Sequence, residues 1–377
     1  MTRRGARVGL LALGALAVAA LPGRRAPAAR QDLAARPSAG PRDLAPPSSA
    51  IVAPTFEALA AMLADPAGPR EIALLSATYR GDLVIKRPVA LHGRAGTILE
   101  GSGTGTVVTV SAADVLLEDV VVRRSGRRHT AEDAGVKASG ERVRLAHARV
   151  EDTLFGVSLL DCKACVVEHV HVIGRAEDPG HAEGAQDQSR GDGIKLWEAH
   201  GSSVRGCLVE RARDLVVWYT RHATLDGNVV RNSRYGTHFM YAHDAVVRGS
   251  HLERNVVGIF VMYSMRMTIE RNVIAGARGA AGVGLGFKDS DAIRVRGNWL
   301  VANTTGTYLD NTPRTRAAPV TFEGNVIALN DVALRFHSSL PGLSFRGNEL
   351  RQNPTLVEVD GGGDALAVEL RRNHYSD

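Results

Sequence analysis

The chain has 377 residues, of which 40 are glycine and 5% are aromatic, and its formal net charge is +6. Many glycines and few aromatics favour a fold of tight turns and thin layers over a helical bundle, and the mixed charges exclude a broad nucleic-acid-binding patch. Three cysteines are too few for a disulfide-dense scaffold.

Residues 1–29 are predicted to be a signal peptide. A basic start, an apolar stretch and a run of small residues follow one another in the order typical of such signals, at Arg3 to Arg7, Val8 to Leu21 and Ala26 to Ala29. The basic start lacks the bulky apolar residues that twin-arginine export needs, so the general secretion route is predicted. No later segment is long and apolar enough to span a bilayer.

Residues 30–53 are rich in Pro, Ala and Ser, show no apolar periodicity, and are predicted to be a flexible leader. Residues 55–63 (TFEALAAML) have helical apolar spacing. A short helix there would cap the domain that follows, where strand edges would otherwise be unpaired. That domain is predicted to fill residues 54–377.

A glycine followed by alternating apolar residues recurs about every 22 residues through the middle of the chain. The repeats begin at Gly135, Gly156, Gly193, Asp214, Gly236, Gly258, Gly282 and Gly306, with Asp214 in the place of a glycine. Each repeat holds three short apolar runs separated by Asn or Gly-Asn corners, where Asn suits sharp turns and can form ladders between coils. The pattern predicts an all-β fold, a right-handed single-stranded parallel β-helix of roughly a dozen coils.

Cys162 and Cys165 have the spacing of a redox or metal-binding pair. Their flanks resemble strands, whereas redox pairs of this spacing usually open a helix. A functional pair, a local disulfide and two buried thiols therefore remain alternatives.

Strand alternation predicts two columns of side chains on one outer face of the coil. The first column runs Lys195, Val216, His238, Phe260, Gly284, Tyr308, and the second runs Trp197, Trp218, Met240, Met262, Gly286, Asp310. The side chains that alternate with these columns are predicted to point inward, and the two inward columns end at Val283 and Leu285. So many aromatic and Met side chains on one face predict a binding surface. In the alternatives, the polar insertion at 175–191 covers this face as a lid, or a slip of one residue turns the columns inward.

Within this face, His238, Met240 and Met262 form a candidate set of soft ligands for Cu(I), with His243, opposite Met265, as a weaker fourth. His and Met in strands are more often packing residues, which is the alternative.

Several of these segments resemble successive repeats of the NosD family. They are RGDGIKLW (190–197), RDLVVWYT (213–220), RYGTHFMYAHD (234–244), VGIFVMYS (257–264), GVGLGFKDSD (282–291) and GTYLDNTP (306–313). The resemblance covers about residues 54–375, and Cys162 and Cys165 are not part of the family pattern.

The resemblance implies a non-enzymatic periplasmic accessory protein for assembly of the copper–sulfide site of nitrous oxide reductase. Its implied partners are an ABC transporter ATPase and permease, a copper chaperone lipoprotein and the apo-reductase. It would contact the membrane only through the transporter, and nucleic acid is not among the implied partners. Copper would be bound transiently as Cu(I) or passed between these partners. The matching motif positions are His238, Met240, His243, Met262, Lys288, Asp289 and Asp310, and the expected partner-binding residues are Trp197, Trp218, Phe260, Lys288, Asp289 and Asp310.

Parallel β-helices also bind or degrade polysaccharides, and degradation requires acid and base groups clustered on one outer face. The candidates here are Asp192, Lys195, Lys288, Asp289, Asp291 and Asp310. They are spread over several coils with apolar columns between them, so charge at coil corners is the more common explanation. A polysaccharide-binding or polysaccharide-degrading protein and a structural or adhesive β-helix remain the alternative functions.

Overall fold

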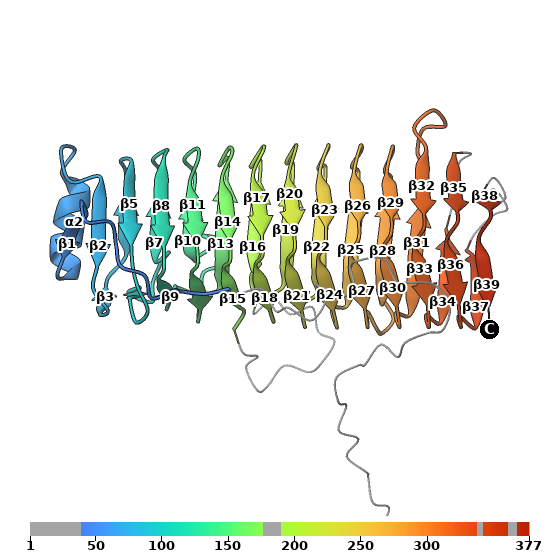
Figure 1. Ribbon diagram of the computed structural model, residues 1–377, viewed down its shortest axis with the longest axis horizontal. Helices are drawn as coiled ribbons and strands as arrows, with labels where there is room; N and C mark the ends of the chain where they lie inside the picture. The colour runs from blue at the N-terminus through green and yellow to red at the C-terminus, as the bar shows by residue number, and fades with distance from the viewer. Residues whose placement is uncertain (1–38, 176–189, 338–341, 361–367, 377) are drawn as a thin grey trace, which may run out of the picture. The chain divides into compact units, whose positions relative to one another are not determined.

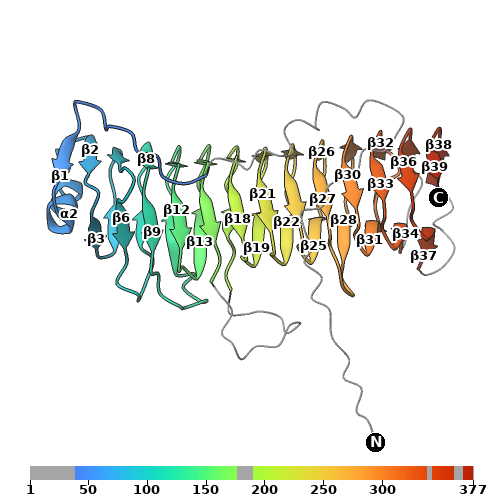
Figure 2. The same ribbon diagram turned by 60° about the horizontal axis from the view of Figure 1, so that its bottom comes forward.

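The computed structural model describes residues 39–175, 190–337, 342–360 and 368–376, and the predicted signal peptide lies outside these ranges. The described chain winds through three parallel sheets, adding one strand to each sheet per coil (Figures 1 and 2). The 13 strands of the second sheet correspond to about 13 coils. The predicted right-handed parallel β-helix is therefore confirmed.

The first sheet contains, in spatial order, β1 (Ile51–Ala53), β2 (Glu71–Leu74), β5 (Val89–His92), β8 (Val115–Glu118), β11 (Arg144–Ala146), β14 (Val166–Glu168), β17 (Ser203–Arg205), β20 (Thr224–Asp226), β23 (Val246–Arg248), β26 (Thr268–Glu270), β29 (Arg294–Arg296), β32 (Val320–Glu323), β35 (Leu343–Arg346) and β38 (Val368–Arg371). The second sheet contains β3 (Thr78–Arg80), β6 (Ile98–Glu100), β9 (Val121–Arg123), β12 (Arg149–Glu151), β15 (His171–Ile173), β18 (Leu208–Glu210), β21 (Val229–Arg231), β24 (His251–Glu253), β27 (Val273–Ala275), β30 (Trp299–Val301), β33 (Val326–Ala328), β36 (Glu349–Arg351) and β39 (His374–Ser376).

The third sheet contains β4 (Leu83–Ile85), β7 (Val108–Val110), β10 (Ala134–Ala138), β13 (Phe155–Leu160), β16 (Ile194–Trp197), β19 (Asp214–Trp218), β22 (Tyr235–Met240), β25 (Val257–Met262), β28 (Val283–Lys288), β31 (Thr305–Asp310), β34 (Val332–Phe336) and β37 (Thr355–Val359). Its strands reach six residues, whereas most strands of the second sheet have three. The third sheet therefore offers the broadest outer face of the coil.

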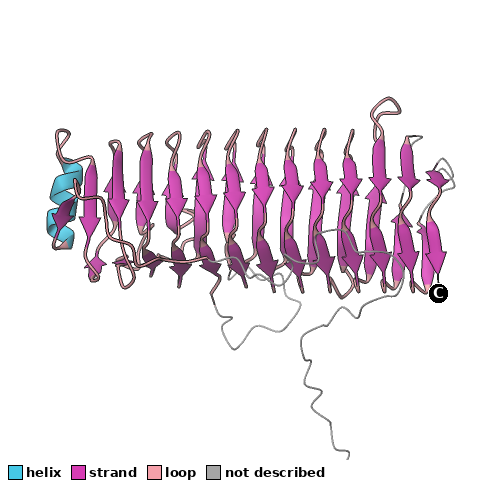
Figure 3. Cartoon of the chain, viewed as in Figure 1, coloured by secondary structure: helices cyan, strands magenta, loops and turns pink. Residues whose placement is uncertain are grey.

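Helix α2 (Phe56–Ala64) lies beside the first coils and is the helix predicted from sequence (Figure 3). The Thr55 hydroxyl caps it by accepting a hydrogen bond from the Ala58 amide at 3.2 Å. Leu59 and Leu63, one turn apart, bury their side chains in the core. No helix in the described ranges is long and apolar enough to cross a membrane.

The described residues before the helix contact the coils. Strand β1 lies within the stretch that the sequence assigns to a leader. The Gly40 amide donates to the carbonyl of His169 at 2.9 Å, and the Arg42 guanidinium pairs with Asp119 at 2.8 Å. This segment thus crosses several coils before the chain enters the first sheet.

Asparagine side chains form two buried ladders at coil corners, as the sequence suggests. One ladder joins Asn272, Asn298, Asn325, Asn348 and Asn373, and the other joins Asn303, Asn330 and Asn353. In the first, each Nδ2 donates to the next Oδ1 at 2.9–3.0 Å. Each side chain thereby satisfies buried polar groups of two neighbouring coils.

The predicted register holds until β28, where it is wrong by two residues. Ile259 pairs with Leu285, and Phe260 pairs with Gly286. The inward columns therefore continue through Leu285 and Phe287 instead of Val283 and Leu285. The cause is the longer corner at residues 276–282, in which the Gly282 amide donates to the Gly279 carbonyl at 2.9 Å. Gly282 belongs to this turn, and Gly284 takes the repeat position.

Candidate functional site

The outer face of the third sheet carries both predicted columns, with the corrected register at β28. The first runs Lys195, Val216, His238, Phe260, Gly286, Tyr308, and the second runs Trp197, Trp218, Met240, Met262, Lys288, Asp310. This excludes the alternative in which a slip of one residue turns these columns inward, because the side chains of the inward columns are fully buried. The proposed lid falls mainly on residues 176–189, outside the described residues.

Aromatic rings on this face pack against one another. The centroids of Trp197 and Trp218 are 5.7 Å apart, and the edge of Trp218 contacts His238 at 5.3 Å with the ring planes at 89°. Tyr235 stacks on His238, with the ring centroids 4.6 Å apart and the ring planes at 17°. The imidazole of His238 is therefore held in a fixed plane by two neighbouring rings and is only 9% exposed.

The two nitrogens of His238 face different chemical groups. Nε2 lies 3.5 Å from Sδ of Met262, on the adjacent strand β25. Nδ1 lies 3.7 Å from Oδ2 of Asp214, is buried, and makes no hydrogen bond with the described part of the chain. The structure thus brings together two of the predicted soft ligands and adds a carboxylate behind them.

Met240 and His243 occupy different positions relative to this pair. Met240 is the direct cross-strand partner of Met262, and both side chains are half-buried. His243 lies beyond the corner and pairs with Met265 on the next coil, as predicted. Burial lowers the pKa of His243, and the nearby Arg221 and Arg266 lower it further. His243 is therefore placed beside the face, in a neutral form that suits metal ligation.

Asp214 is a completely buried carboxylate. Arg234 donates to it twice, from Nε to Oδ1 at 2.9 Å and from Nη2 to Oδ2 at 2.5 Å. Burial raises the pKa of Asp214, but the facing His238 and Arg234 outweigh burial and hold that pKa below its usual range. The carboxylate beside His238 is therefore ionised at neutral pH.

The remaining predicted partner-binding residues lie around this centre. The half-buried Phe260 ring extends over Gly286, where an added Cβ would come within 2.4 Å of the ring. Lys288 donates to Asp310 at 2.5 Å, and this bond raises the pKa of Lys288. Asn311 donates to Asp289 at 2.5 Å. The C-terminal edge of the face is therefore charged but internally paired.

Sequence reasoning missed a ladder of tyrosines next to the second column. Tyr219, Tyr241 and Tyr263 stack at 5.2 and 5.0 Å, each with a left-handed φ near 50°. The first two line a groove of about 320 Å³ that also contains His243. Their regular spacing of one coil was a signal that could have identified them.

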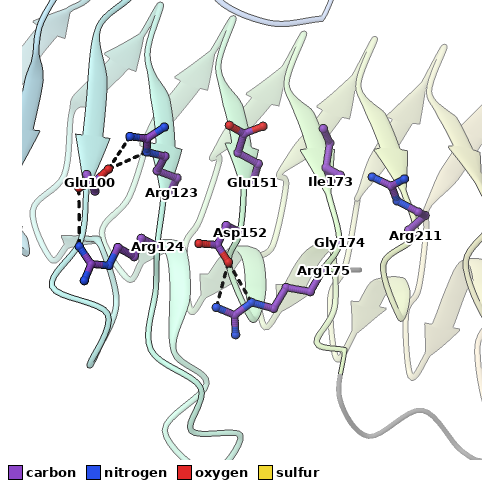
Figure 4. Close-up of a pocket in the computed structure, with 9 residues that line it drawn as sticks. All are labelled: Glu100, Arg123, Arg124, Glu151, Asp152, Ile173, Gly174, Arg175 and Arg211. Atoms are coloured by element: carbon purple, nitrogen blue, oxygen red, sulfur yellow. Dashed lines mark hydrogen bonds and ion pairs between the residues drawn. The ribbon is translucent and has the colours of Figure 1, made fainter. Parts of the chain in front are cut away.

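A second groove, of about 530 Å³, lies at corners that follow strands of the second sheet (Figure 4). It is lined by Glu100, Arg123, Arg124, Glu151, Asp152, Ile173, Gly174, Arg175 and Arg211. Arg123 pairs with Glu100 at 2.5 Å, and Arg175 pairs with Asp152 at 3.1 Å. Glu100, Arg123, Glu151 and Ile173 are the last residues of successive strands of the second sheet, and their recurrence once per coil was a signal that could have identified this groove.

The cysteines lie apart from both grooves. Cys162 and Cys165 form a local disulfide, one of the alternatives that the sequence left open. Cys207 is fully buried, and burial raises its pKa to about 12. Its thiol is therefore unreactive at neutral pH.

Comparison with known proteins gives one family match and two named relatives. The model of a family described as "Periplasmic copper-binding protein (NosD)" matches residues 177–368. A protein of Stutzerimonas stutzeri named "Probable ABC transporter binding protein NosD" is 32% identical over 151 residues, which are 40% of this chain and 33% of that protein. A protein of the same name from Pseudomonas aeruginosa is 32% identical over 145 residues, which are 37% of this chain and 32% of that protein. The match spans about a third of the length of each relative.

Solved structures share the fold. The catalytic unit of a GH87 α-1,3-glucanase from Streptomyces thermodiastaticus superposes with a TM-score of 0.66 at 14% identity, covering 88% of this chain and 70% of that one. The A-module of the mannuronan C-5 epimerase AlgE6 from Azotobacter vinelandii gives 0.52 at 12% identity, covering 85% and 95%. At these identities the likeness shows the fold alone.

Proposed function

Because the chain belongs to the NosD family of periplasmic copper-binding proteins, we propose that it binds Cu(I) at His238 and Met262 and passes it on as cargo. Met240 would supply a third ligand from the same column as Met262, and His243 would be a weaker fourth ligand. In this proposal the protein is exported by a signal peptide at residues 1–29 and works in the periplasm through its domain at 54–377.

The contact between His238 and Met262 carries the proposal. Imidazole nitrogen and thioether sulfur are ligands that suit Cu(I). With bonds of about 2.0 Å to nitrogen and about 2.3 Å to sulfur, the lengths found at zinc sites, donors 3.5 Å apart subtend about 109° at a shared ion. This is the tetrahedral angle. The two atoms are thus spaced for one ion without rearrangement of the strands.

Replacing His238, Met240 and Met262 together by alanine is expected to weaken Cu(I) binding at least about 100-fold, since loss of outer-shell partners alone costs about 10- to 100-fold. Affinity would be measured by competition with a chromophoric Cu(I) chelator. The control variant His251→Ala removes a histidine of the second sheet, which lies outside the two columns, and should retain the affinity. Unchanged binding by the triple variant would contradict the copper site.

The partners are the second part of the proposal. The face around Trp197, Trp218 and Phe260 would dock an ABC transporter, formed by an ATPase and a permease, and would also receive a copper chaperone lipoprotein and apo nitrous oxide reductase. The relatives' name, ABC transporter binding protein, supports the first of these partners. The paired charges of Lys288, Asp289 and Asp310 would form a polar rim around the aromatic centre.

Trp218→Ala is expected to weaken binding to the detergent-solubilised transporter at least about 30-fold, because buried tryptophans at interface centres contribute about 2 kcal/mol or more. Binding of purified proteins would be followed by biolayer interferometry. Val84→Ala, at an exposed apolar position of the same sheet, serves as the matched control. If both variants bind like the wild type, the docking face lies elsewhere.

The charged groups do not favour polysaccharide degradation. A general acid needs a raised pKa, whereas the hydrogen bond from Arg123 lowers the pKa of Glu100 in the second groove. Asp192 lies just before β16, and although burial raises its pKa, it is only 1% exposed and is paired with Arg213. Lys195 of β16 is paired with Glu132. We therefore propose an accessory role without catalysis, and turnover of a polyuronate or glucan by the purified protein would contradict it.

A further inference from the structure

We propose that Asp214 is a positioning residue for His238, whose imidazole it holds in the tautomer protonated at Nδ1. The lone pair of Nε2 then faces Sδ of Met262, and the weak Nε2–H···S bond that the other tautomer would make at 3.5 Å is given up for the contact of Nδ1–H with the carboxylate. The consequence for metal binding rests on the proposed function, whereas the tautomer is a property of the protein alone.

The first support is the place of Asp214 in the repeat. Neighbouring coils have glycine there, and at Gly258 an added Cβ would lie 2.3 Å from the carbonyl oxygen of Gly284. At Asp214 the strands are irregular, since the register between β19 and β22 shifts between Asp214 and Val216. This coil thus combines a local irregularity with a fully buried charge, neither of which the β-helix itself requires.

The second support is the direction of the carboxylate. Oδ1 accepts from Arg234 Nε and from the Tyr235 amide at 3.3 Å, so both of its lone pairs are used. Oδ2 accepts one bond from Arg234 and points its free side toward Nδ1 of His238 at 3.7 Å. A proton on Nδ1 faces this negative oxygen favourably, whereas a lone pair there is repelled by it.

The third support is that different neighbours of the imidazole fix its plane and select its tautomer. Tyr235 and Trp218 fix the plane of the imidazole but carry no charge that selects a tautomer. Asp214 supplies that charge, and Arg234 keeps the carboxylate in place. A metal-binding histidine commonly donates its second N–H to a carboxylate in this way, which fixes the ring and frees the other nitrogen for the ion.

Asp214→Asn is expected to reverse the tautomer. The amide oxygen is expected at the Oδ1 position, where two donors converge, rather than at the Oδ2 position, where Arg234 Nη2 alone donates. The NH2 group then takes the Oδ2 position, Arg234 Nη2 loses its acceptor there, and the NH2 group donates to Nδ1. His238 must then carry its proton on Nε2, facing Met262. Asp192→Asn is the matched control, because Asp192 is an equally buried carboxylate that Arg213 holds at 2.8 and 3.0 Å, and no histidine of the described residues pairs with it.

The test is a long-range ¹H–¹⁵N correlation spectrum of the full chain, labelled with ¹⁵N-histidine and free of metal, at neutral pH. His238 is assigned from the signal lost in His238→Gln. We expect Nδ1–H in the wild type and in Asp192→Asn, and Nε2–H in Asp214→Asn. A wild-type ring protonated on Nε2, or on both nitrogens, would overturn the proposal even if Asp214→Asn did not fold.

Cu(I) competition on the same three proteins separates this proposal from the copper site. Asp214→Asn should bind Cu(I) about 10- to 100-fold more weakly than the wild type, and Asp192→Asn should bind it equally well. Absence of Cu(I) binding by the wild type would refute the proposed function and leave the tautomer result standing. Equal affinity of all three proteins would refute the positioning role in metal binding.

Discussion

Replacing Asn298 by alanine is expected to lower the free energy of unfolding by about 3–6 kcal/mol. Oδ1 of Asn298 accepts from the backbone amide and from Nδ2 of Asn272, both at 3.0 Å, and Nδ2 of Asn298 donates to the carbonyl of Ile269 at 2.8 Å. Alanine leaves the Asn272 amide and the Ile269 carbonyl without these partners, at about 1–3 kcal/mol each. It also removes one of the two bonds of Asn272 Nδ2, which still donates to the carbonyl of Val247 at 3.1 Å.

The loss would be measured by urea denaturation and, residue by residue, by hydrogen exchange of the Asn272 amide. Exchange is the sharper readout, since a repeat fold can open locally around one coil. Asn232→Gly is the control, because Asn232 is an exposed corner residue with φ of 54°, which glycine adopts freely. A loss in Asn298→Ala no larger than in Asn232→Gly would mean that the ladder contributes little.

Arg213→Ala is expected to cost about 3–5 kcal/mol at neutral pH, because it leaves the carboxylate of Asp192 buried and unpaired. Asp192 is 1% exposed, and Arg213 donates to both of its oxygens. Arg248→Ala, which breaks the half-exposed pair with Asp226, should cost less than about 1 kcal/mol. Equal losses in the two variants would contradict a special role of burial.

The cost of Arg213→Ala should also depend on pH. Burial raises the pKa of Asp192, and Arg213 opposes that rise, so removing Arg213 raises this pKa further. Between the ordinary pKa of aspartate, about 3.9, and the raised value, the folded protein binds more protons than the unfolded one. Stability therefore falls as pH rises through this window. The deficit of the variant should be smaller at pH 5 than at pH 7, measured by denaturation at both; a deficit that grows on acidification would contradict this.

The β-helix was predictable because its period and strand alternation are local properties of the sequence. His238 and Met262 were predictable as column neighbours for the same reason. The register of β28 was not, because two extra corner residues carry no apolar signal and shift the pattern there, whereas Tyr308 and Asp310 on the next coil take their predicted columns. Asp214 was noticed only as an exception among glycines, since its contact with His238 depends on a strand irregularity that the repeat does not encode.

In the proposed function, the spacing of the coils limits which side chains can bind the same ion. Equivalent atoms on adjacent coils are about 4.8 Å apart and on alternate coils about 9.6 Å, whereas two metal–ligand bonds end to end span only about 4.5 Å. In the proposed function, one ion would therefore be shared most easily by side chains of the same coil or of adjacent coils, as with His238 and Met262. A protein that receives the ion would then bring its own ligand to the coil of His238 and Met240 or to that of Met262.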